Sequence, residues 1–86
     1  MIITKQTVAD QIAAHLHHQL SVEQLVNWAE DAVMDGEFAE SDEATLVAVV
    51  SRLGVADVRT FGLTWLDCEQ MLGQLGYTAR VEIVTV

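Results

Sequence analysis

The chain has 86 residues, a formal net charge of −9 at pH 7 and only four basic residues. Its length is that of one domain with a thin core, although 51% of the residues are hydrophobic and the mean hydropathy is +0.29. The charge argues against binding to nucleic acid or to anionic membranes, because both interactions depend on lysine and arginine.

The sequence shows no sign of a membrane span or of export. Its longest uninterrupted apolar run, residues 46–50, is five residues, against about 20 for a membrane-spanning helix. The first residues lack the apolar central region of a signal peptide. The single cysteine, Cys68, excludes an internal disulfide and fits a reducing compartment. We therefore expect a soluble cytoplasmic protein.

Start and stop signals predict four short helices within a single domain, residues 1–86. Thr4 caps the first helix. Along it, apolar residues recur every four positions and form one stripe: Val8, Ile12, Leu16 and Leu20. Ser21 and Gln24 have the spacing of a capping box, which begins a second helix. That helix ends at Gly36, for which we expect the left-handed conformation.

Ser41 or Asp42 begins a third helix, and Gly54 ends it. Its apolar positions repeat at helical spacing: Leu46, Val49, Val50 and Leu53. Thr64 and Asp67 form a second capping box at the start of a fourth helix. The inner face of the fourth helix is expected to hold Trp65, Cys68, Met71, Leu72 and Leu75.

After Gly76, which ends the fourth helix, residues 77–86 alternate and predict a strand. Both faces of this strand become apolar toward its end, at Val81, Ile83, Val84 and Val86. An unpaired strand of this kind is a sticky edge, so we expect it to pair with the N-terminus or with a second copy across a dimer. The predicted fold class is mainly α, a compact bundle of four short helices with a C-terminal strand.

Seven of the 13 acidic residues gather in one segment that contains no lysine, arginine or histidine. This acidic band consists of Glu30, Asp31, Asp35, Glu37, Glu40, Asp42 and Glu43. Runs of charge are commonly only solvated surface. The alternative is a docking face that recognises a basic protein by charge complementarity.

The sequence supports a metal site or a reactive thiol less well than it supports a docking face. His15 and His18 are three residues apart, on one side of the predicted first helix, but no spacing supplies further metal ligands. An EF-hand register centred on Gly36 places Val33 where a calcium ligand is required. Cys68 lies between two acids, which hold back thiolate formation. We therefore expect no metal site, no cofactor and no enzymatic activity.

The segments 25–38 (LVNWAEDAVMDGEF) and 53–77 (LGVADVRTFGLTWLDCEQMLGQLGY) resemble short acidic helical proteins that occur as uncharacterised bacterial products. The resemblance implies a bacterial cytoplasmic setting and a compact helical fold. It implies no activity and no site residue.

The sequence favours a small acidic, non-enzymatic protein-interaction module, either an adaptor or an antitoxin-like or immunity-like inhibitor of a basic partner. The alternative is a self-associating structural module that forms a homodimer through its C-terminal strand. A metal-binding protein is the least favoured of the three.

Overall fold

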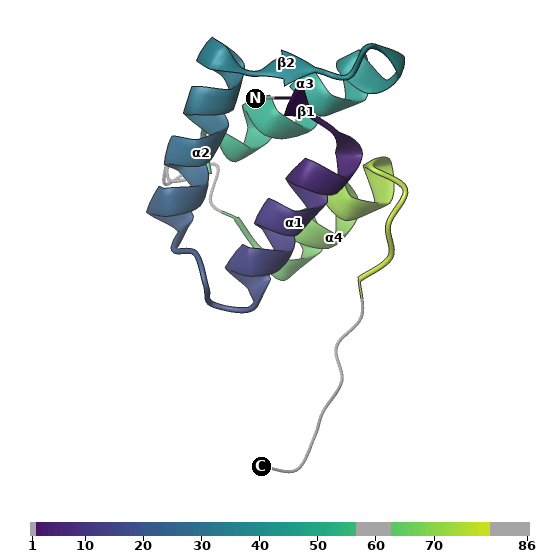
Figure 1. Cartoon of the computed structure of the whole chain (residues 1–86). Helices are drawn as coiled ribbons and strands as arrows, with labels where there is room; N and C mark the ends of the chain where they lie inside the picture. Colours follow the sequence, from purple (N-terminus) through teal and green to yellow (C-terminus); the bar gives the residue numbers. More distant parts are fainter. Residues whose placement is uncertain (1, 57–62, 80–86) are drawn as a thin grey trace, which may run out of the picture.

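A computed structural model describes residues 2–56 and 63–79. The described chain is mainly helical, as predicted (Figure 1). Its elements, in order, are β1 (Ile2–Ile3), α1 (Lys5–Leu16), α2 (Val22–Asp35), β2 (Glu37–Phe38), the 3-10 helix η1 (Glu40–Asp42), α3 (Glu43–Leu53) and α4 (Trp65–Gln74).

The predicted capping boxes are confirmed at the start of two helices. The Gln24 N–H donates to the Ser21 Oγ at 3.1 Å, and the Ser21 N–H donates to the Gln24 Oε1 at 2.9 Å. Thr64 and Asp67 exchange the equivalent pair of bonds at the start of α4. Thr4 also caps α1 as predicted, with Thr7 as its partner. These bonds satisfy backbone donors that a helix start leaves free.

The first helix ends at Leu16 and not at Leu20 as its apolar spacing predicts. His18 adopts a left-handed conformation with φ 62°, which ends the helix. The Nδ1 atom of His15 then lies 3.0 Å from the carbonyl oxygen of Leu20 and donates a hydrogen bond to it. Leu20 therefore lies outside α1 and does not belong to the apolar stripe of this helix.

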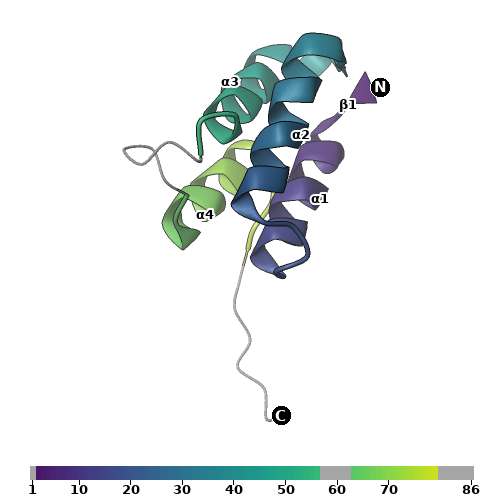
Figure 2. The same cartoon turned by 90° about the vertical axis from the view of Figure 1, so that its left-hand side faces the viewer.

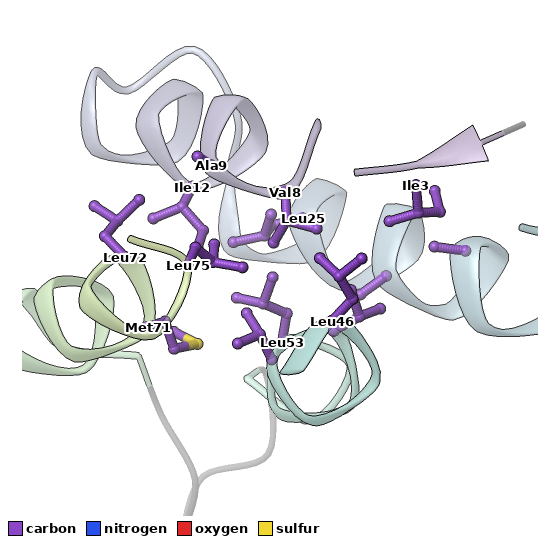
Figure 3. Packing of buried hydrophobic residues seen from close by; sticks show 14 of the residues in the cluster. Ile3, Val8, Ala9, Ile12, Leu25, Leu46, Leu53, Met71, Leu72 and Leu75 are labelled. Carbon is purple, nitrogen blue, oxygen red and sulfur yellow. The ribbon is translucent and has the colours of Figure 1, made fainter. Parts of the chain in front are cut away.

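One hydrophobic core joins β1 and the four helices of the described chain. Figure 3 shows Ile12 of α1, Leu53 of α3 and Leu75 at the end of α4 converging on its centre. Four of the residues predicted for the inner face of the fourth helix are confirmed as buried: Cys68, Met71 and Leu72 on α4, and Leu75 directly after it. The prediction for Trp65 is wrong, because this first residue of α4 is 41% exposed.

A short parallel pairing connects the N-terminus to the middle of the chain. Ile2 lies opposite Glu37, and Ile3 lies opposite Phe38. The Ala39 N–H donates to the Ile3 carbonyl oxygen at 2.9 Å and extends the pairing. The N-terminal strand is thereby held against β2, which separates α2 from α3 in the sequence.

Gly36 is required for a reason other than the one predicted. Its φ is −83°, so the expected left-handed conformation is wrong. A Cβ atom at this position would lie 2.6 Å from the Ala32 carbonyl oxygen and 2.9 Å from the Ile3 Cγ1 atom. Glycine therefore allows β1 to approach the end of α2. Gly76, with φ 90°, does adopt the left-handed conformation after α4.

The predicted strand over residues 77–86 is not shown. Residues 77–79 form no strand, and the N-terminal strand pairs with β2. The remaining residues, 80–86, lie outside the described part of the chain. They include the four predicted dimer contacts, Val81, Ile83, Val84 and Val86.

Candidate functional site

The acidic band follows the chain over four elements. Glu30, Asp31 and Asp35 lie on α2, Glu37 on β2, Glu40 and Asp42 in η1, and Glu43 at the start of α3. All of them are exposed except Asp42, which is partly buried. The end of α2, β2 and η1 form the upper edge of the molecule in Figure 1. The structure thus spreads the acids along one end and does not gather them into a compact cluster.

The described chain contains one lysine and one arginine, and each of them forms an ion pair. The Lys5 Nζ lies 3.6 Å from the Asp42 Oδ1, and the Arg52 Nη2 lies 3.4 Å from the Asp67 Oδ2. Within the described part of the chain, Asp42 is the one member of the acidic band in an ion pair. Among residues 2–56 and 63–79, the α2 carboxylates have no lysine or arginine partner.

An apolar groove of about 350 Å³ lies between α2 and the end of α3. Figure 2 shows these two helices side by side. The groove is lined by Ala29, Glu30, Val33, Met34, Val50, Ser51, Gly54 and Val55. We refer to it below as the α2/α3 groove.

The helical register of α2 explains its wall of this groove. Val33 follows Ala29 by four residues and Met34 follows Glu30 by four, so each pair lies on one side of the helix. Ala29 is buried, whereas Val33 is 53% exposed and Met34 is 79% exposed. Full burial of a large apolar side chain contributes about 1.5–3 kcal/mol to the stability of a fold or of a complex. Because Val33 and Met34 stay largely exposed, they contribute little of this free energy to the described fold.

The opposite wall is formed by the last turn of α3 and the turn that follows it. Val50 is buried at the base, and Val55 is 38% exposed at the rim. A Cβ atom on Gly54 would meet no atom closer than 3.5 Å, so packing does not require glycine there. The missing side chain at residue 54 adds to the open space between the two helices.

The α2 side of this groove carries one carboxylate, that of Glu30. Asp31 and Asp35 lie on the same helix but outside the lining of the groove. An apolar surface with an acidic border is chemically suited to a partner that combines apolar and cationic side chains. The acids were predicted from the sequence, but the apolar half of the site was not. Its sequence signal is a pair of adjacent apolar residues inside the acidic band.

A second groove, of about 560 Å³, lies between α1 and α4. Its walls include Leu16 and Leu72, with Trp65 and Tyr77 as exposed aromatic side chains. It reaches Ala79, the last described residue before the predicted dimer contacts. Its lining therefore includes the described residue that directly precedes residues 80–86 in the sequence.

The histidines and the cysteine occupy separate positions. His15 lies on α1, but His18 lies beyond its end, so the predicted helical pair of metal ligands does not form. In the described ranges, no three His, Cys, Asp or Glu side chains gather as a metal site requires. Cys68 is 1% exposed. Its burial raises the pKa of the thiol, the Asp67 carboxylate raises it further, and Arg52 lowers it by less.

No protein-family model, curated protein or solved structure matches this chain. Within residues 2–56 and 63–79, no helix is both long enough and apolar enough to cross a membrane. Function is therefore inferred from the groove and from the charges beside it.

Proposed function

We propose that the protein is a non-enzymatic interaction module that binds a basic partner protein through the α2/α3 groove and the acids beside it. Such a module acts as an adaptor or as an inhibitor that covers the partner's basic surface. One observation carries the proposal. Met34 and Val33 are 79% and 53% exposed on a helix that also presents the carboxylates of Glu30, Asp31 and Asp35, which have no lysine or arginine partner within residues 2–56 and 63–79.

The two halves of this surface contribute differently to binding. Burial of Met34 and Val33 under a partner supplies affinity, because apolar area leaves water. The carboxylates supply selectivity and a faster encounter, because a chain with net charge −9 attracts basic proteins and repels acidic ones. The buried Cys68 thiol, whose pKa is raised, gives no support to a nucleophilic mechanism.

A pull-down and a titration test the proposal. The tagged full chain is incubated with lysate of its host at low and at high salt, and retained proteins are identified by mass spectrometry. Each purified partner is then titrated against the wild type and against the triple variant Glu30→Lys, Asp31→Lys, Asp35→Lys. We expect the variant to bind at least about tenfold more weakly, which corresponds to about 1.4 kcal/mol.

Glu69→Lys is a control for a single charge reversal at a remote position, because Glu69 is exposed on α4, away from the α2/α3 groove. It reverses a charge without touching the proposed surface and should leave the affinity within about twofold, as expected for a remote surface charge. An unchanged Kd for the triple variant with every partner identified refutes the proposed function.

Self-association is the second candidate function. It is favoured by the exposed Trp65 and Tyr77 at the groove between α1 and α4, whose lining includes Ala79. Sedimentation of the full chain and of a chain lacking residues 80–86 tests it. A dimer that becomes a folded monomer after deletion supports this candidate, and a full chain that is monomeric at all concentrations contradicts it.

A further inference from the structure

We propose that the α2/α3 groove binds a short amphipathic helix that carries lysine or arginine beside two apolar side chains one turn apart. This inference rests on the proposed function and specifies the part of the partner that is recognised. It follows from the backbone of the groove walls, from the length of the groove and from the charges around it.

The groove walls favour a helix over an extended peptide. Both walls are helical or turn segments whose backbone groups bond within their own segments: Gly36 N–H to the Ala32 carbonyl on α2, and Gly54 N–H to the Val50 carbonyl on α3. The walls therefore offer no strand edge to an extended peptide, whose own N–H and C=O groups would lose water without gaining partners. A helix satisfies its own backbone and presents only side chains to the groove.

The length of the groove limits the contact to about two anchors. On α2 it extends over residues 29–34, which is about 8 Å along the helix axis at 1.5 Å per residue. Residues i and i+4 of a docked helix are separated by about 6 Å along its axis. Two apolar side chains at this spacing fit the length of the groove, between Met34 on one wall and Val55 on the other.

The charges select a basic helix and disfavour a second copy of this chain. Glu30 lines the groove, and Glu23 lies on the same side of α2 two turns earlier. Asp31 and Asp35 lie farther around α2, beyond Met34 and outside the lining of the groove. A second copy would bring the same carboxylates and a net charge of −9 against these residues. Lysine or arginine on the side of the docked helix that faces α2 pairs with Glu30 and Glu23.

Designed peptides test this inference without knowledge of the natural partner. The probe is a fluorescein-labelled alanine-rich peptide of 16 residues, with leucine at positions 7 and 11 and lysines flanking that face. The first comparison peptide replaces both leucines with serine, and the second replaces the lysines with glutamate. A third, rich in threonine and valine, alternates leucine and lysine in the pattern of a strand. Fluorescence anisotropy gives each Kd with the full chain, and NMR shift changes of the labelled chain locate the contact.

Two variants of the chain are designed to disrupt contact between the probe peptide and the groove without changing the packing of the hydrophobic core. Met34→Gln changes a side chain that is already exposed. Gly54→Leu adds a side chain at the groove wall, where a Cβ atom has only ordinary contacts. Leu66→Gln is the control, because Leu66 is exposed on α4 and does not line the groove. Thermal unfolding checks that all three variants retain the fold.

We expect the probe to bind, with its shift changes confined to α2 and the end of α3. Met34→Gln and Gly54→Leu should each weaken binding at least about tenfold, and Leu66→Gln by less than about twofold. The serine and glutamate peptides should each bind at least about tenfold more weakly than the probe.

Other outcomes overturn the inference. Equal or tighter binding of the alternating peptide identifies an extended partner, and concentration-dependent association that Met34→Gln abolishes identifies a second copy. Absence of probe binding, with a lower melting temperature for Met34→Gln, identifies a segment of the same chain as the occupant. If the probe fails while the triple charge reversal still releases a natural partner, the helix inference is wrong and the proposed function stands. If the triple reversal releases no partner, the proposed function itself is wrong.

Discussion

Gly36 lies so close to Ile3 that a Cβ atom on residue 36 would be 2.9 Å from the Ile3 Cγ1 atom and 2.6 Å from the Ala32 carbonyl oxygen. The second contact is with backbone, which cannot move aside as the end of a flexible side chain can. We therefore expect Gly36→Ala to lower the free energy of unfolding by about 1–3 kcal/mol, as overpacking does. Urea denaturation monitored by circular dichroism measures the change.

Gly73→Ala is the matched control for that substitution. Gly73 lies within α4, and a Cβ atom there would have no neighbour within 4 Å. Alanine is the better helix former, so this variant should be more stable than the wild type by about 0.5–1 kcal/mol. Equal effects of the two substitutions would show that β1 does not pack against the end of α2 in solution.

The pH dependence of stability should report on Asp67. Hydrogen bonds from the Thr64 N–H and hydroxyl lower the pKa of the Asp67 carboxyl, with a smaller contribution from Arg52, while desolvation opposes them. Because the folded pKa is lower than the unfolded one, Asp67 stabilises the fold fully above the ordinary carboxyl pKa of about 3.9. That stabilisation is lost as the pH falls through the lower, folded pKa.

Asp67→Asn separates this contribution from those of the other acids, because asparagine keeps the shape and an oxygen acceptor but has no charge. We expect the variant to be less stable than the wild type at pH 7, with the difference shrinking as the pH is lowered through the carboxyl range. Melting temperatures at pH 7, 5, 4 and 3 measure it. A difference that stays constant with pH would contradict a charged role for Asp67.

Local interactions made much of this fold predictable from the sequence. The partners Ser21 and Gln24 are three residues apart, and so are Thr64 and Asp67, so helix starts could be identified before any tertiary contact was known. The end of α1 could not be identified in this way. The apolar spacing continues to Leu20, but the turn at His18 ends the helix earlier.

Features that depend on distant parts of the chain were missed. The requirement for Gly36 comes from Ile3, which reaches it only after β1 pairs with β2. Met34 is similar, because its position at a groove depends on where the end of α3 lies against α2. The acidic residues of the candidate site were visible in the sequence, since a run of charge requires no tertiary information to be recognised.

Cys68 should react slowly with thiol reagents in the folded protein. It is buried, and its thiol pKa is raised, so both access and thiolate formation are restricted. It is the single cysteine of the chain, so the labelling rate reports on one site. We expect labelling by a maleimide at pH 7.5 to be at least about a hundredfold slower in buffer than in 6 M urea, as for a site exposed only by opening of the fold.

A core variant distinguishes opening of the fold from direct access to this thiol. Leu53→Ala removes a fully buried side chain and should lower the stability by about 2–5 kcal/mol. If labelling requires opening, its rate rises by about tenfold for each 1.4 kcal/mol lost. If Cys68 of the folded wild type reacted as fast as Cys68 of the unfolded chain, the burial of this residue would be contradicted.

Salt should stabilise the fold at neutral pH. The chain has a net charge of −9, and the α2 acids have no lysine or arginine partner among the described residues. The screening length falls from about 30 Å at 0.01 M salt to about 10 Å at 0.1 M. A domain of this length has a radius of gyration of about 12 Å, so added salt weakens repulsion between acids across the whole molecule. We expect the melting temperature to rise between 0.01 and 0.2 M sodium chloride.

The neutralised variant Glu30→Gln, Asp31→Asn, Asp35→Asn tests whether the α2 acids cause this response. Its net charge is −6, the −9 of the wild type less three negative charges. With less repulsion to screen, the variant should melt higher than the wild type in low salt and respond less to added salt. Differential scanning calorimetry at both salt concentrations measures the two effects. A wild type whose melting temperature is unchanged or lower in salt would mean that its acids are already compensated within the folded chain.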